Sequence, residues 1–151
     1  MNIALDMMGG DFAPLETVKG AAEYLASATS GIHLTLIGDE TQIREHLISL
    51  PIPAEKYSIV HAATVIEMNE HPTKALKEKQ DSSIAIGFQL LAAGKTDAFI
   101  SAGNTGAMMV GALFSIKAIE GVLRPTIGAY MPREDGTLGL LVDAGLNADC
   151  K

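Results

Sequence analysis

The chain has 151 residues, of which 48% are hydrophobic and 19% are charged, so we expect one globular unit or part of one. Its net charge of −7 argues against broad electrostatic binding to nucleic acid, and no nucleic-acid partner is expected. The single cysteine, Cys150, cannot form an internal disulfide, and the N-terminus lacks the basic and apolar segments of a signal peptide. We therefore expect a cytoplasmic protein.

The first half of the chain alternates short apolar runs with stretches whose apolar residues recur at helical spacing. In order, we expect a strand at 3–5, a helix that follows Pro14 and continues to 25, and a strand at 32–37. A second helix over 43–50 is then stopped by Pro51 and Pro53, and a strand follows at 57–62. Gly31 and the pair Gly38–Asp39 mark the turns between these elements.

The second half continues the alternation. Residues 72–94 are predicted to be helical in two pieces, with a break near Asp81 where Ser82 or Ser83 can cap the second piece. We then expect a strand at 97–101, an apolar helix at 105–120, and strands at 126–131 and 138–142 joined as a hairpin through Asp135–Gly136. This order predicts a three-layer α/β/α unit with a mainly parallel sheet.

Residues 98–116 carry no charge, which is about the length of a bilayer span, roughly 20 residues. The run contains Ser101, Asn104 and Thr105 among glycines, and such a turn would leave polar groups unsatisfied in hydrocarbon. A buried strand, a loop and a helix explain the run better, so no transmembrane segment is expected. No amphipathic basic helix is evident, and peripheral membrane association stays open.

Three polar, glycine-rich loops follow predicted strands, where ligands gather in open α/β sheets. They are residues 6–11, 101–106 and 143–147. In the middle loop, glycines allow close backbone approach and the next helix directs its N–H groups at the loop, an arrangement suited to phosphate or carboxylate. A tight strand–helix turn capped by Asn104 or Thr105 is the structural alternative.

Other kinds of site fit the sequence poorly. Gly94-Lys95-Thr96 resembles the end of a P-loop but lacks its first glycine, and no dinucleotide-binding glycine motif occurs. The four histidines show no metal-ligand spacing, so neither a metal nor another cofactor is expected. Asp11 precedes a helix and suits a cap, whereas Asp6 and Asp143 at strand ends are harder to explain structurally. The lysines 74, 77 and 79 suit a solvated helix face or contact with an acidic ligand.

Several segments together resemble the PlsX family of phosphate acyltransferases. Residues 6–14 are similar to its D-A-M-G-G-D-x-A-P signature, residues 101–107 (S-A-G-N-T-G-A) to its central motif, and residues 143–147 to its D-x-G-A-N motif. Arg124-Pro125 matches an R-P step, and residues 77–83 resemble R-x-K-x-x-S-S. Met7, Lys77 and Leu146 depart from the family residues, and a lysine cannot make the bidentate phosphate contact of an arginine.

This resemblance implies an enzyme of bacterial phospholipid synthesis that converts acyl-ACP (an acyl thioester of acyl carrier protein) and inorganic phosphate into acyl phosphate and free carrier protein. It also implies the fold of phosphotransacetylases and isocitrate-dehydrogenase-like enzymes, and a homodimer. Family members continue through a second half, so we expect residues 1–151 to be the N-terminal part of a single α/β enzyme and to be inactive alone.

On this interpretation Asn104 and Asp143 are the expected catalytic residues, with Asn104 donating to the oxyanion and Asp143 orienting donors. The expected phosphate and substrate site comprises Asp6, Gly9, Gly10, Asp11, Lys79, Ser82, Ser83, Ser101, Gly103, Thr105, Gly106 and Asn147. Three alternatives stay open: a phosphotransacetylase acting on acyl-CoA, a dehydrogenase of the related fold, and a non-catalytic module that binds the carrier protein.

Overall fold

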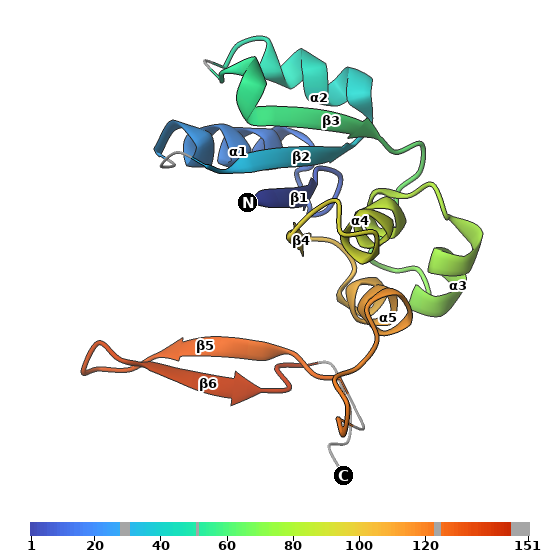
Figure 1. Ribbon diagram of the computed structural model, residues 1–151, viewed down its shortest axis with the longest axis vertical. Helices are drawn as coiled ribbons and strands as arrows, with labels where there is room; N and C mark the ends of the chain where they lie inside the picture. The colour runs from blue at the N-terminus through green and yellow to red at the C-terminus, as the bar shows by residue number, and fades with distance from the viewer. Residues whose placement is uncertain (28–30, 51, 123–124, 146–151) are drawn as a thin grey trace. The chain divides into compact units, whose positions relative to one another are not determined.

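The computed structural model describes residues 1–27, 31–50, 52–122 and 125–145. The chain divides into two compact units, Met1–Ile116 and Lys117–Lys151, and each is described by itself. The first unit contains a four-stranded, wholly parallel sheet in the order β3-β2-β1-β4 (Figure 1). Its strands are β1 (Asn2–Asp6), β2 (His33–Gly38), β3 (Tyr57–His61) and β4 (Ala98–Ile100).

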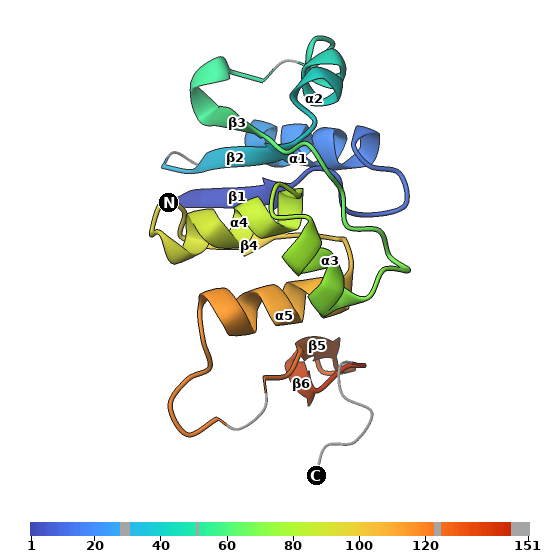
Figure 2. The same ribbon diagram turned by 90° about the vertical axis from the view of Figure 1, so that its right-hand side faces the viewer.

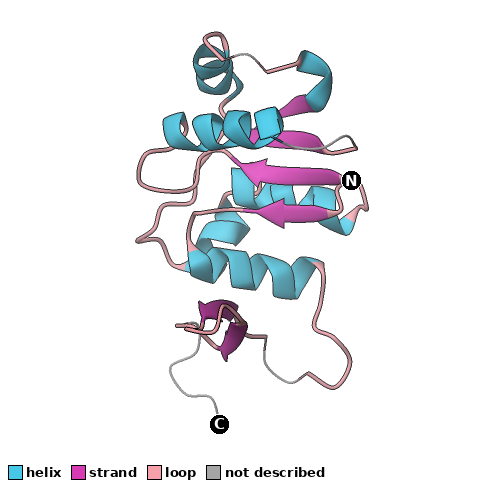
Figure 3. Cartoon of the chain, turned by 90° about the vertical axis from the view of Figure 1, so that its left-hand side faces the viewer, coloured by secondary structure: helices cyan, strands magenta, loops and turns pink. Residues whose placement is uncertain are grey.

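Helices lie on both faces of this sheet, as the alternation of elements predicts. Helices α1 (Leu15–Ser27) and α2 (Glu40–Leu47) cover one face, and α4 (Ser83–Ala92) covers the other. Figures 2 and 3 view the sheet from opposite sides, with α4 in front in the first and α1 in front in the second. Helices α3 (Pro72–Glu78) and α5 (Thr105–Ser115) pack with α4 around Phe88 and Ala107. The predicted three-layer fold is confirmed.

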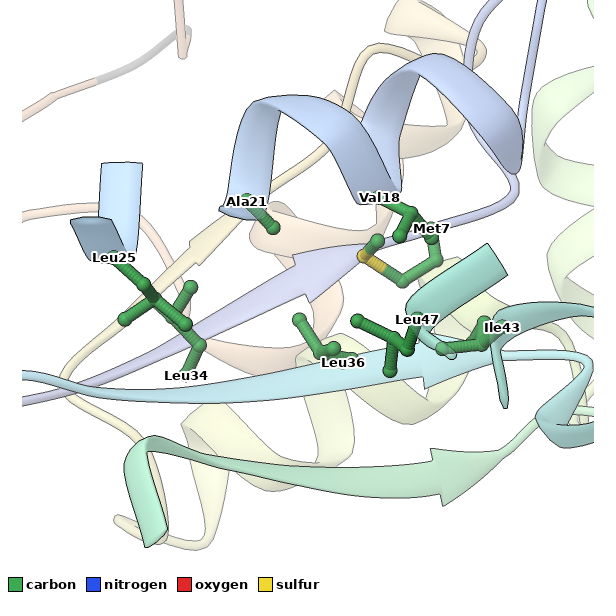
Figure 4. Close-up of a cluster of buried hydrophobic side chains, with 8 residues drawn as sticks. All are labelled: Met7, Val18, Ala21, Leu25, Leu34, Leu36, Ile43 and Leu47. Carbon is green, nitrogen blue, oxygen red and sulfur yellow. The ribbon is translucent and has the colours of Figure 1, made fainter. Parts of the chain in front are cut away.

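The main core lies between the sheet and the α1–α2 layer. Side chains of β2 alternate between the two faces: Leu34 and Leu36 point into this core, and Ile37 belongs to the core on the α4 side. Figure 4 shows the cluster that they join, whose members are Met7, Val18, Ala21, Leu25, Leu34, Leu36, Ile43 and Leu47. Because both faces are buried, the strands are apolar runs rather than alternating ones.

The break in the helical segment 72–94 is confirmed, and Ser82 is the cap. Its hydroxyl accepts a hydrogen bond from the Ala85 N–H at 3.3 Å, as expected for a serine that begins a helix. The helix predicted to run from 105 to 120 ends earlier, at Ser115. Lys117 has a φ of 72°, and this left-handed backbone conformation stops the helical hydrogen bonding. A short 3₁₀ helix at Ala54–Lys56 was not expected from the sequence.

In the second unit, β5 (Gly128–Pro132) and β6 (Leu138–Val142) form the expected antiparallel hairpin. Its turn is closed by Asp135, whose Oδ1 accepts from both the N–H and the hydroxyl of Thr137 at 3.0 and 2.6 Å. Among the described residues no helix combines the length and the apolar character needed to cross a bilayer. The uncharged run 98–116 is β4, a loop and α5.

Candidate functional site

Two of the three glycine-rich loops meet where β1 and β4 end. These strands are parallel neighbours with Leu5 opposite Ile100, so Asp6 and Ser101 come next at the same edge of the sheet. The Ser101 hydroxyl donates to Asp6 Oδ2 at 2.6 Å, and Asp6 Oδ1 accepts from the Met8 N–H at 2.9 Å. Asp6 is only 4% exposed. Its carboxylate is therefore buried, and its hydrogen bonds link the two loops.

The loop after β1 approaches the loop after β4 through Gly9. A Cβ placed on Gly9 would lie 2.6 Å from the Gly103 nitrogen and 2.8 Å from Asp6 Oδ2, so the loops would have to shift to admit any side chain there. Gly103 in turn donates its N–H to Ser101 Oγ at 2.9 Å. Gly10 has a φ of 103°, a conformation that glycine adopts readily. Two backbone segments distant in sequence are thus held in contact.

Asn104 caps α5 with its side chain. Its Oδ1 accepts from the Ala107 N–H at 2.9 Å, which fixes the amide so that Nδ2 points the other way. Nδ2 donates to the carbonyls of Glu67, Met68 and Glu70 at 3.0, 3.3 and 3.2 Å. The capping alternative is therefore present in the structure. The donation of Asn104 to an oxyanion stays a prediction, since its amide hydrogens face the 67–70 turn here.

The first turn of α5 leaves backbone donors for a ligand. The first N–H groups of a helix have no acceptor within the helix, and Asn104 satisfies only that of Ala107. Within the described residues, the N–H groups of Thr105 and Gly106 have no hydrogen-bond acceptor. Gly106 lies tightly against Pro72, because a Cβ there would be 2.4 Å from the Pro72 ring. This helix start can bind an anion.

Three other predicted contacts lie on the neighbouring α3–α4 segment. Lys79 Nζ forms an ion pair with Glu70 Oε2 at 2.6 Å and also donates to the Val65 carbonyl at 2.6 Å. This pairing holds the pKa of Glu70 below its usual value, with a further contribution from the Glu67 N–H. Ser82 is fully buried as the cap of α4, and Ser83 is buried as its first residue. Direct contact of these residues with an anion stays a prediction.

The remaining predicted residues belong to other segments of the chain. Asp11 is exposed in the turn before α1, which begins four residues later. Asp143 belongs to the second unit, where it follows β6 with a φ of 63° and its N–H donates to the Ile127 carbonyl at 2.7 Å. Asn147 lies outside the described residues, as do Arg124, Leu146 and Cys150.

An apolar groove of about 380 Å³ borders the Asp6–Ser101 pair. Its walls come from β1, β4 and α1, and they include Leu5, Ile100, Ala21 and Tyr24. Its volume falls within the range of ligand pockets, roughly 300–1,000 Å³. The described part of the chain contains no group of three or more histidine, cysteine or acidic side chains that could hold a metal.

The turn at 67–70 was missed by the sequence analysis. It lies in the connection between β3 and α3 and contains no glycine, and its carbonyls contribute through the backbone, which the sequence does not reveal. The only available signal was the pair of glutamates before Pro72, and nothing in their spacing points to Asn104 or to Lys79.

The model of the fatty acid synthesis protein family matches residues 1–151. The chain is 48% identical over 151 residues to a phosphate acyltransferase of Dictyoglomus turgidum and 48% identical to one of Acetivibrio thermocellus, covering all of this chain and 44% of each relative. A phosphate acyltransferase of Neisseria meningitidis is 41% identical and covers 99% of this chain. The chain therefore spans less than half the length of these curated relatives.

A solved structure has a similar fold. The EutD phosphotransacetylase from Staphylococcus aureus superposes with a TM-score of 0.65 and 25% sequence identity, covering 98% of this chain and 47% of the other. This similarity confirms the expected phosphotransacetylase-like α/β fold.

Proposed function

Because the chain belongs to the fatty acid synthesis protein family, whose model spans its whole length, we propose that it forms part of a phosphate acyltransferase. The reaction moves an acyl group from a thioester of acyl carrier protein to inorganic phosphate, with no cofactor. The observation that carries the proposal is the junction of the two glycine-rich loops, joined by the Ser101–Asp6 hydrogen bond beside the N-terminus of α5.

The chemistry needs little from the protein beyond positioning and charge stabilisation. A phosphate oxygen of HPO₄²⁻ attacks the thioester carbonyl, the new C–O bond forms, and the C–S bond breaks. The phosphate proton passes to the leaving sulfur, so the products are the acyl phosphate dianion and the free thiol. Phosphate is a competent nucleophile and a thiolate is a good leaving group, so no Ser-His-Asp triad is required.

The N-terminus of α5 is the proposed phosphate contact. The N–H groups of Thr105 and Gly106 supply donors at the positive end of the helix dipole, where anions bind. Ser101 and Gly103 shape the loop that precedes the helix, and Asp6 orients Ser101. Gly9 and Gly10 bring the first loop against this site. The exposed Asp11 follows them in the same loop.

The apolar groove supports an acyl substrate. Its lining includes Leu5 and Ile100 as well as the Asp6–Ser101 pair, so a hydrocarbon chain lying in it would be close to the loop that precedes α5. We assign Asn104 and Asp143 the roles of donor and donor-orienting carboxylate, and Lys79, Ser82, Ser83 and Asn147 the role of completing the substrate site. A homodimer, a cytoplasmic location and peripheral contact with membranes belong to the same proposal.

The test is a phosphate-dependent thioester cleavage assay in which hydroxylamine traps acyl phosphate. It is run on this chain and on a chimera in which residues 1–151 replace the matching 44% of the Dictyoglomus turgidum relative. We expect the chimera to consume acyl-ACP only when phosphate is present, and the 151-residue chain alone to be inactive.

Acetyl-CoA is the comparison substrate, because the structural neighbour is a phosphotransacetylase. A chimera that prefers acyl-ACP supports the proposal. Preference for acetyl-CoA would favour the phosphotransacetylase alternative, and binding of acyl-ACP without any thioester loss would favour a carrier-protein-binding module. Thioester cleavage that does not depend on phosphate would contradict the proposal.

A further inference from the structure

Glu70 lies outside every motif that the sequence singles out, yet one of its oxygens closes the turn on which Asn104 rests. Glu70 Oε2 accepts from the Glu67 N–H at 2.8 Å and from Lys79 Nζ at 2.6 Å. Because both donors converge on a single oxygen, the carboxylate ties the two ends of the 67–70 turn together and joins them to the end of α3.

Lys79 completes this closure from the other side. Its Nζ reaches the Val65 carbonyl at 2.6 Å, just before the turn, while holding Glu70. The side chains of Lys79 and Glu70 are 29% and 31% exposed, so the ion pair is less open to solvent than Lys19–Glu16 or Arg44–Glu40. An ion pair shielded in this way and bonded to backbone groups constrains local geometry more than an exposed pair does.

The closed turn presents three carbonyls to a single amide. The carbonyls of Glu67, Met68 and Glu70 all accept from Asn104 Nδ2, while Asn104 Oδ1 caps α5 at Ala107. Asn104 is 5% exposed, so its amide has no water to replace a lost carbonyl. The position of the helix start therefore depends on the position of the turn.

We propose that Glu70 and Lys79 are positioning residues that set the N-terminus of α5 through the 67–70 turn and Asn104. As far as catalysis is concerned, this inference rests on the proposed function, since α5 is the proposed phosphate contact. Lys79 then acts through its bonds to Glu70 and the Val65 carbonyl. It affects a bound anion by fixing the turn that positions α5.

The structural test is amide hydrogen exchange measured by NMR on the 151-residue chain. In Glu70→Ala we expect the exchange protection of the Ala107 N–H to fall by about tenfold, the size expected for losing one hydrogen bond to a charged group. Lys79→Met should give the same loss, and Lys79→Arg, which keeps a donor for Glu70, should restore most of the protection. The Ile43 N–H in α2 should exchange at its original rate in all three.

Glu40→Ala is the matched control, because it removes a glutamate from another ion pair, Arg44–Glu40, on α2. It should leave Ala107 unchanged. Unchanged protection of Ala107 in Glu70→Ala would overturn the proposal. An equal loss at Ala107 in Glu40→Ala would also overturn it, since the effect would then be one of global stability.

The functional test uses the chimera described above. We expect Glu70→Ala to lower kcat/KM for phosphate by about tenfold while leaving KM for acyl-ACP unchanged, because only the phosphate contact is displaced. An equal change for both substrates would contradict a positioning role. If the unmodified chimera shows no phosphate-dependent cleavage, the proposed function fails, and the exchange of Ala107 still tests the coupling of Glu70 to α5.

Discussion

The Ser101 hydroxyl and the Asp6 carboxylate form a 2.6 Å hydrogen bond between residues that are 95 positions apart in the chain. The bond exists because β1 and β4 are parallel neighbours that end at the same level of the sheet. Ser101 also accepts from the Gly103 N–H, so the order of the second loop depends on a carboxylate supplied by the first. The two motifs therefore form one structural unit.

Replacing Asp6 tests that dependence. Asp6→Ala leaves the Ser101 hydroxyl and the Met8 N–H without their acceptor at a buried position, and we expect a loss of about 1–3 kcal/mol in the free energy of unfolding. Urea unfolding followed by circular dichroism measures it. Asp11→Ala in the adjacent exposed turn is the control and should change the stability by less than about 0.5 kcal/mol. Equal midpoints for the two variants would show that the bond contributes nothing.

Gly9 tests the contact between the loops in a second way. In Gly9→Ala the added methyl group meets the backbone nitrogen of Gly103 at 2.6 Å, which cannot move aside as a side-chain end can. We expect a destabilisation of about 1–3 kcal/mol and a loss of turnover in the chimera. Gly20→Ala in α1 is the control, because a Cβ there meets nothing within 4 Å. It should raise the free energy of unfolding by about 0.5–1 kcal/mol. A destabilisation of Gly20→Ala as large as that of Gly9→Ala would contradict the argument.

Sequence periodicity predicted most of the fold because the strands are short apolar runs and the helices carry regular apolar stripes. It also located the two loops that meet, since both follow strands of one parallel sheet. The end of α5 was predicted wrongly, because the apolar pattern continues past Ser115 while the backbone turns left-handed at Lys117. The support of Asn104 by the 67–70 carbonyls was beyond prediction, since it depends on where an irregular turn packs.

Asn104→Ser separates the cap from the side-chain amide. Serine is a good N-cap, so the Ala107 N–H keeps an acceptor, but the donor to the 67–70 carbonyls is lost. We expect the chimera to lose roughly 100-fold in turnover in both Asn104→Ser and Asn104→Ala. Both variants leave the 67–70 carbonyls without their donor and should be destabilised, and the alanine variant should lose roughly 1 kcal/mol more for the cap, seen as a urea midpoint below that of Asn104→Ser. Near-normal turnover in Asn104→Ser would mean that capping alone matters.

Acid should weaken the 67–70 turn. The pKa of Glu70 is lowered from its usual value of 4.5 by the hydrogen bond from Lys79 and then by the Glu67 N–H. Because the carboxylate is more acidic in the folded protein, its ionised form stabilises the fold at pH values above the unfolded-state pKa. This stabilisation is lost as the pH falls from 4.5 through the lower, folded-state pKa. Glu70→Gln removes this titration, so its stability measured by urea unfolding should depend less steeply on pH below 4.5. Identical slopes for the two proteins would contradict the prediction.

Lys74 and Lys77 are exposed on α3, whereas Lys79 is held by Glu70, so only the first two remain available to an acidic partner. If the carrier protein docks near α3, Lys77→Glu should raise the KM for acyl-ACP in the chimera several-fold and leave the KM for phosphate unchanged. The effect should shrink as salt is added, because exposed charges more than about 10 Å apart are screened at 0.1 M ionic strength. Lys95→Glu makes the same charge change at another exposed lysine and should have little effect. An equal rise in KM for both variants would reflect net charge alone and would remove α3 as the docking surface.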